Sequence, residues 1–135
     1  MKIGIVVGTF NKGLTDVMVE EAKKTIQKLN LELVEIAEVP GVFDMPIIIK
    51  KLLENKKIDA VLCLGVIKKG DTLHDEVIGF STSKTMQELS IQYNKPVANG
   101  IIGPGVTLKQ AETRLKDYAR RGVEARLKLH QLMNL

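Results

Sequence analysis

Four short apolar runs alternate along this chain with segments whose apolar residues recur at helical spacing, and this alternation constrains the fold more than any other feature. The apolar runs lie at Lys2–Val7, Leu31–Ala37, Asp59–Ile67 and Pro96–Ile102. The helical patterns cover Leu14–Leu29, Ile47 to about Asn55, Thr72 to about Tyr93, and a long stretch that begins at Thr107. Strands that alternate with helices predict a parallel sheet with helices on both faces and right-handed crossovers.

The individual runs also predict where each strand lies in the sheet. The third run is the most apolar, which indicates a central strand, whereas the second alternates apolar residues with Glu32 and Glu35, which is typical of an edge strand with one wet face. The chain has 135 residues, a length that suits one domain. We therefore expect a single α/β domain over residues 1–135, a three-layer sandwich built on a four-stranded parallel sheet.

The cysteine content and the length of the apolar runs indicate the cellular compartment of the protein. The single cysteine, Cys63, lies inside the third apolar run, so we expect a buried thiol, no internal disulfide and a reducing compartment. No apolar run approaches the roughly 20 residues that span a bilayer, and the chain opens directly as a strand, without the pattern of a signal peptide. We expect a cytoplasmic protein with no membrane partner.

Charge and motifs exclude several functions. The net charge of +4 is concentrated after Thr107, where seven Lys or Arg residues accompany three acidic ones. A basic helix can serve an anionic ligand or only solubility, and the lack of interleaved aromatic residues argues against nucleic acid. The sequence has no phosphate-loop motif, no dinucleotide-binding fingerprint, no Cys-x-x-Cys and no paired histidines. We therefore expect no metal and no cofactor.

The carboxyl ends of the strands are the expected binding edge, because ligands of parallel sheets bind outside those ends. Four loops meet there: Gly8–Gly13, Val39–Pro46, Lys68–His74 and Asn99–Thr107. Two of them carry Phe10 and Phe43, which could anchor the core or stack on a planar heterocycle. The residues alone leave both interpretations open.

Two helix starts at this edge match capping boxes, Thr72-Leu-His-Asp75 and Thr107-Leu-Lys-Gln110. A helix start offers free backbone N–H groups to a phosphate, and His74 beside it can accept or pass a proton near neutral pH. The alternative is an exposed histidine in a first helical turn. The residues predict a site for a phosphorylated small molecule with a histidine nearby.

Four short motifs at these loops resemble the lumazine synthase family, most closely its archaeal members. The motifs are Phe10-Asn11, Val39-Pro-Gly-Val-Phe-Asp44, Gly70-Asp-Thr-Leu-His74 and Gln110-Ala-Glu-Thr-Arg114, and the resemblance covers nearly the whole chain. It implies a flavodoxin-like fold and the condensation of 5-amino-6-(D-ribitylamino)uracil with 3,4-dihydroxy-2-butanone 4-phosphate. The product would be 6,7-dimethyl-8-ribityllumazine, a precursor of riboflavin, formed without metal or organic cofactor.

The resemblance also implies roles for single residues. Phe10 would stack on the pyrimidine, and the loop of Val42, Phe43 and Asp44 would bind the ribityl chain. Asp71 and Thr72 would hold the phosphate, with Arg114 as counter-charge, and His74 would relay protons. Asn11, Asn99 and Arg121 complete the expected substrate-binding set. Asn99 stands where bacterial relatives often carry an aromatic residue, and Arg121 where relatives often place a lysine.

The family resemblance further implies a homo-oligomer, a pentamer that is free or packed into an icosahedral shell. The pattern of the final helix agrees, because a four-stranded sheet is too small to cover both of its apolar stripes. The first stripe is Leu115, Ala119, Val123 and Leu127, and the second is near Leu108, Ala111, Tyr118 and Ala125. Two alternatives remain at this point. One is an archaeal-type riboflavin synthase, which is homologous, and the other is a flavin- or nucleotide-binding module without catalysis.

Overall fold

The computed structural model describes all 135 residues and contains four strands and five α-helices. In chain order they are β1 (Lys2–Gly8), α1 (Lys12–Lys28), β2 (Glu32–Val39), the single 3-10 turn η1 (Val42–Asp44), α2 (Met45–Glu54), β3 (Ala60–Lys68), α3 (His74–Tyr93), β4 (Val97–Val106), α4 (Leu108–Glu112) and α5 (Leu115–Met133). All four predicted strands and all the predicted helical regions are present.

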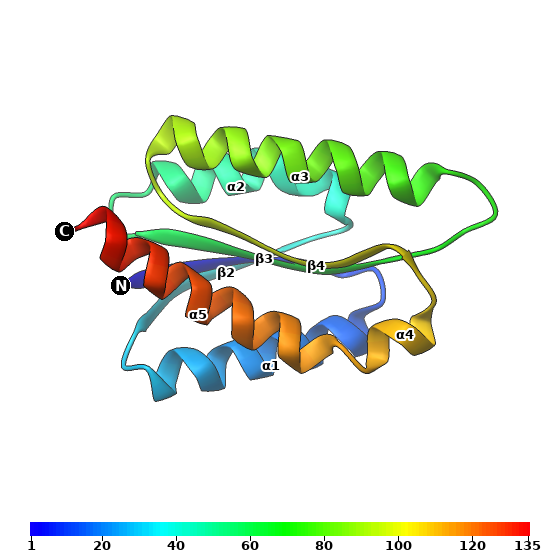
Figure 1. Cartoon of the computed structure of the whole chain (residues 1–135), viewed down its shortest axis with the longest axis horizontal. Coiled ribbons are helices and arrows are strands. Elements are labelled where there is room, and N and C mark those ends of the chain that lie inside the picture. Colours follow the sequence, from blue (N-terminus) through cyan, green and yellow to red (C-terminus); the bar gives the residue numbers. More distant parts are fainter.

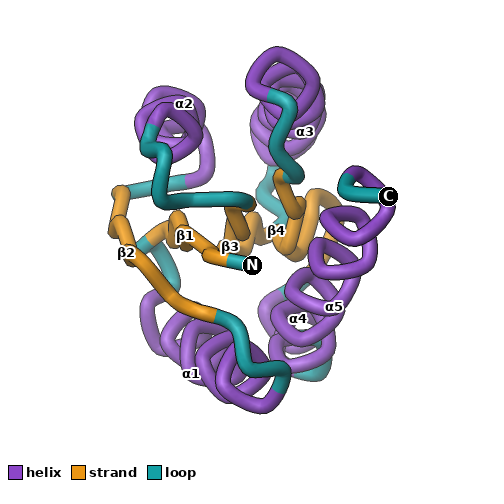
Figure 2. The backbone as a smooth tube through the Cα atoms, turned by 90° about the vertical axis from the view of Figure 1, so that its left-hand side faces the viewer, coloured by secondary structure: helices purple, strands orange, loops and turns teal.

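The strands form one parallel sheet in the order β2-β1-β3-β4. Helices α2 and α3 cover one face, and α1, α4 and α5 cover the other, which gives three layers (Figures 1 and 2). The predicted α/β sandwich is therefore confirmed. The central place of β3 and the edge place of β2 are confirmed as well, because β3 lies between β1 and β4 whereas β2 pairs only with β1.

The core is aliphatic and divided by the sheet into two clusters of 15 buried residues each. One cluster joins α1 and α5 to the sheet, and the other joins α2 and α3 to it. Cys63 lies in the second cluster and is fully buried, and this burial raises the pKa of its thiol to about 12. The thiol is thus a small packing group, as the sequence predicts. No helix has the length and apolar character needed to cross a bilayer.

The final helical region is not the single helix that its periodicity predicts. It is divided into α4 and α5, and Arg114 is the N-cap residue of α5. The carbonyl of Gln110 accepts hydrogen bonds from the side chains of Thr113 and Arg114. The backbone N–H of Arg114 donates instead to the carbonyl of Ala111. Side chains that compete for a backbone carbonyl interrupt a helix in this way. The capping box of Thr107 and Gln110 at the start of α4 is confirmed.

The capping box predicted at Thr72 is wrong. Helix α3 begins at His74, its N-cap residue is Leu73, and no side chain caps it. Thr72 Oγ1 accepts a hydrogen bond from the backbone N–H of His74 at 3.3 Å. Asp75 does not reach back to Thr72, because its carboxylate accepts from the backbone N–H of Gly105 at 2.9 Å. A contact between distant segments replaces the local one.

Strand β4 is longer than predicted, and this changes the place of Asn99. The strand runs to Val106, so Asn99 is its third residue and does not end it. Its side chain lies away from the carboxyl edge of the sheet and contacts α3, where Nδ2 donates to Ser83 Oγ at 2.9 Å. The expectation that the loop at this edge begins at Asn99 is wrong, because Gly100 to Ile102, and then Val106, continue the pairing with β3.

Replacing Lys95 with methionine should lower the free energy of unfolding by about 1 to 3 kcal/mol. Lys95 Nζ donates to the carbonyls of Leu53 and Asn55 at 2.8 and 3.1 Å, so its charge satisfies the C-terminal end of α2. Denaturant unfolding at one protein concentration measures the change. Lys56→Met is the control, because Lys56 is exposed and close to the same helix end. An equal effect of both substitutions would show that Lys95 does not stabilise α2.

Candidate functional site

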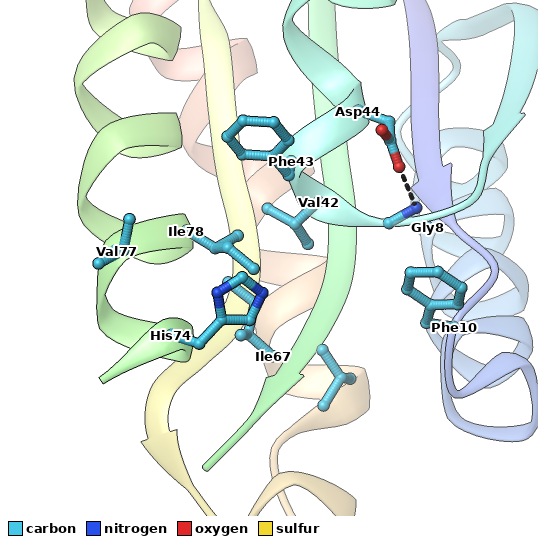
Figure 3. Close-up of a pocket in the computed structure, with 11 residues that line it drawn as sticks. Gly8, Phe10, Val42, Phe43, Asp44, Ile67, His74, Val77 and Ile78 are labelled. Atoms are coloured by element: carbon cyan, nitrogen blue, oxygen red, sulfur yellow. Dashed lines mark hydrogen bonds between the residues drawn. The ribbon is translucent and has the colours of Figure 1, made fainter. Parts of the chain in front are cut away.

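A cavity of about 310 Å³ lies at the carboxyl ends of β1 and β3 (Figure 3). Three of the four predicted loops supply its walls: Phe10 follows β1, Val42 to Asp44 follow β2, and His74 follows β3. Val66, Ile67, Val77 and Ile78 complete its apolar lining and were not singled out by the sequence. The predicted binding edge is therefore a real concavity, largely apolar with few polar groups, as small-molecule sites usually are.

Phe10 stands at the mouth of this cavity with 66% of its surface exposed. Its ring lies against the backbone of Gly41, and a Cβ at Gly41 would come within 2.7 Å of Phe10 Cε2. Only glycine permits so close an approach, so the β2–α2 loop supports one side of the ring. Core anchoring does not explain this phenylalanine, whereas the exposed ring can stack on a flat heterocycle.

The loop after β2 is closed by one of its own carboxylates. Asp44 Oδ2 accepts a hydrogen bond from the backbone N–H of Gly41 at 3.0 Å (dashed line in Figure 3). Within the loop Val42 is buried and Phe43 is 66% exposed. The turn thus presents a second aromatic ring and a carboxylate at the cavity, groups that can contact an apolar ring and accept from hydroxyls.

His74 lies across the cavity from Phe10, with its imidazole beside Ile67 and Ile78 (Figure 3). It is the first residue of α3 and is exposed. Asp71 and Thr72 precede it in an exposed loop, beside the cavity but not in its wall. The residues that the sequence predicts for proton exchange and for anion binding are thus close to one another at this edge of the sheet.

Asn11 supports this site from the opposite loop. It is the N-cap residue of α1 in the left-handed conformation, with φ of 62°. Its Nδ2 donates to the carbonyl of Val66 at 3.4 Å, at the end of β3. The side chain therefore joins the loop that carries Phe10 to the strand beneath the cavity.

The remaining predicted residues lie elsewhere on the chain. Asn99 and Arg121 line a second cavity of about 310 Å³ between α5 and β4, which shares no residue with the first. Arg121 is hydrogen-bonded to Asp117 at 3.2 Å, and this arginine with Arg120 lowers the pKa of the Asp117 carboxyl. Arg114 lies in neither cavity and folds back onto the carbonyl of Gln110 at 2.6 Å.

Two polar residues of the second cavity, Tyr118 and Arg126, were not predicted as site residues from the sequence. Arg126 Nη1 donates to the carbonyl of Val97, and its Nε is buried without a partner. Burial lowers the pKa of its guanidinium. Nothing in the sequence distinguishes Arg126 from the solvated basic residues of the same helix, because only the position of β4 decides which of them is covered.

No group of three or more His, Cys, Asp and Glu side chains has an arrangement that could hold a metal ion. The two polar side chains of the first cavity, Asp44 and His74, instead lie on different sides of its wall. They can hold a polar ligand and exchange protons with it.

Comparison with known proteins identifies the family. A profile of the 6,7-dimethyl-8-ribityllumazine synthase family matches residues 1–135. A protein of that name from Saccharolobus solfataricus is 47% identical, with 97% of this chain and 85% of the relative aligned. Those from Metallosphaera sedula and Methanococcus aeolicus are each 42% identical, covering 98% and 99% of this chain and 88% and 98% of the relatives. The chain therefore belongs to the 6,7-dimethyl-8-ribityllumazine synthase family.

Proposed function

We propose that this protein condenses 5-amino-6-(D-ribitylamino)uracil with 3,4-dihydroxy-2-butanone 4-phosphate to form 6,7-dimethyl-8-ribityllumazine. The observation that carries the proposal is the cavity in which Phe10, the Val42–Asp44 loop and His74 meet in a chain of this family. An archaeal-type riboflavin synthase is not favoured, because the similar proteins bear the lumazine synthase name. A pure binding module has no need of the exposed imidazole.

In this proposal the two substrates occupy neighbouring parts of one site. The uracil ring stacks on Phe10, and its ribityl hydroxyls donate to Asp44. The phosphate of the butanone lies near Asp71 and Thr72, beside the start of α3, whose free N–H groups favour an anion. Such binding brings the amine of one substrate to the ketone of the other.

Acceleration of this reaction depends mainly on the positioning of the two substrates and on proton transfer. The amine attacks the ketone and water leaves to give an imine, inorganic phosphate is eliminated, and ring closure releases a second water. Each step moves a proton to or from nitrogen or oxygen, and His74 is placed to relay it. Holding both reactants in one cavity supplies much of the remaining acceleration.

One assay tests the proposal directly. Purified protein should convert the two substrates to a product with lumazine absorbance, and inorganic phosphate should appear in equal amount. The same preparation should form no riboflavin when it receives lumazine alone. Riboflavin from lumazine without any condensation would assign the chain to the riboflavin synthases, and no reaction in either assay would leave it a binding module.

We further propose that complete sites form between subunits of a homopentamer. The predicted substrate-binding residues fall into separate groups on one chain, with Phe10 and His74 at the first cavity and Asn99 and Arg121 at the second. A head-to-tail ring brings the second group of one subunit to the first group of the next. Exposed apolar side chains on α3, Val77 at 60% and Phe80 at 66%, are candidates for the contact.

The apolar stripes of the last helix support this proposal only in part. Leu115, Ala119 and Val123 are buried within the chain, so the chain's own fold covers this part of the first stripe. In the second stripe Leu108 remains 38% exposed and Ala125 is exposed. A partner chain is needed for this stripe alone.

Mixing two impaired variants should restore activity when the butanone phosphate is below saturation. In a ring assembled at random from equal amounts of His74→Ala and Arg114→Ala chains, about one quarter of the sites combine two intact halves. Refolding the variants together should therefore raise the rate at a low butanone phosphate concentration well above that of either alone, and light scattering should give the mass of five chains. A monomer mass, or a mixture no more active than the mean of its components, would contradict sites between subunits.

A further inference from the structure

The loop between β3 and α3 is held at both ends by the same short segment. The backbone N–H of Lys69 donates to the carbonyl of Val106 at 2.7 Å, and the backbone N–H of Gly105 donates to Asp75 Oδ2 at 2.9 Å. All residues from Gly70 to His74, between these two anchors, are exposed. The shape of the loop therefore depends on its anchors more than on its own packing.

Asp75 is unusual among the acidic side chains of this protein. It is 6% exposed and is the only buried carboxylate. A buried carboxylate is unfavourable unless hydrogen bonds and charges compensate it. The Gly105 N–H and the N-terminal end of α3 supply this compensation, so the bond between Asp75 and Gly105 is a strong constraint on both segments.

One helical turn further on, α3 contacts the same segment again. A Cβ at Gly79 would lie 2.6 Å from Pro104 Cδ, so the helix and the turn approach as closely as glycine permits. Asp75 and Gly79 are four residues apart and share one face of α3. The two contacts together fix the rotation of α3 about its axis as well as its distance from the end of β4.

We propose that Asp75 is a positioning residue, which acts through its hydrogen bond to Gly105 and holds His74 and the Asp71–Thr72 loop in the geometry that the condensation requires. The inference rests on the proposed function. His74 is the adjacent residue of the same first turn, so it points about 100° away around the helix, into the cavity. Any rotation of α3 that lengthens the Asp75–Gly105 bond moves the imidazole by a comparable amount.

Two conservative variants separate this geometric role from a role of charge. Asp75→Asn keeps an acceptor oxygen at the same distance from the backbone and removes the charge. Asp75→Glu keeps the charge and moves the carboxylate outward by one methylene group, which displaces Gly105 or α3. Glu76→Gln is the matched control, because Glu76 is the next residue and no hydrogen bond joins its side chain to the Gly103–Val106 segment.

We expect Asp75→Asn to keep most of the turnover number and Asp75→Glu to lose about 10- to 100-fold, since a displacement near 1 Å can lower a rate about 100-fold. Glu76→Gln should resemble the parent. Hydrogen exchange measured by mass spectrometry should show faster exchange in peptides that contain Gly105 and residues 69–74 for Asp75→Glu only. Circular dichroism and oligomer mass should be unchanged in all three variants.

The reverse order of activity, with Asp75→Glu active and Asp75→Asn impaired, would overturn the proposal and assign Asp75 a charge role. Parent-like activity and exchange in both variants would overturn it also. If the parent itself does not condense the two substrates, the proposed function fails instead. In that case the exchange data test only whether the Asp75–Gly105 hydrogen bond holds the loop, and unchanged exchange in Asp75→Glu would show that it does not.

Discussion

Replacing His74 with alanine should lower the turnover number by about 10²- to 10⁴-fold without abolishing the condensation. The imidazole lies in the wall of the cavity and is the only group there that both accepts and donates protons near neutral pH. Its loss removes acid–base assistance from each step. The reaction continues slowly because the amine remains nucleophilic, and the cavity still brings it to the ketone.

The fold should survive this substitution. Thr72 Oγ1 accepts from the backbone N–H of residue 74 and Asp75 remains bonded to Gly105, so neither contact needs the imidazole. His130→Ala is the control, since this second histidine is near the end of α5, where its neighbour is Asn134. Steady-state kinetics with both substrates measure the effect. An unchanged turnover number for His74→Ala would exclude a catalytic role for this histidine.

Replacing Arg114 with alanine should raise the Michaelis constant for the butanone phosphate by about 10- to 150-fold, with a much smaller change for the aminouracil. A hydrogen bond between charged groups contributes about 1.5 to 3 kcal/mol, which corresponds to this range of affinity. Arg114 is exposed at the break between α4 and α5, where its guanidinium bonds the carbonyl of Gln110. In the proposed pentamer it can leave this carbonyl for the phosphate at the next subunit.

Two further variants test whether the effect depends on the guanidinium of Arg114 and on its position. Arg114→Lys should recover part of the affinity, because a point charge remains whereas the bidentate guanidinium does not. Lys116→Ala removes an equal charge two residues away and should have little effect if the contact is specific. Unfolding curves show whether the loss of the bond to Gln110 changes stability. Equal weakening toward both substrates, or none, would remove Arg114 from the phosphate site.

The sequence was sufficient to predict the architecture and the part of the site that lies at the first cavity. Strands and helices follow from periodicity, which is a property of neighbouring residues, and the central place of β3 and the edge place of β2 follow from how apolar each run is. Once the sheet is parallel, the loops after β1, β2 and β3 must meet at one edge. Phe10, Asp44 and His74 could therefore be assigned to one cavity without coordinates.

Only the tertiary structure decided which hydrogen bonds are made where local and distant partners compete. Asp75 matches a local capping box, yet it bonds to Gly105, 30 residues away, because β4 continues to Val106 and brings that N–H to the start of α3. The break at Arg114 likewise depends on which donor reaches the carbonyl of Gln110. The separation of Asn99 and Arg121 from the first cavity depends on where β4 and α5 pack. Periodicity reports which face of an element is buried, whereas the partner of a polar group depends on segments that meet only in the folded chain.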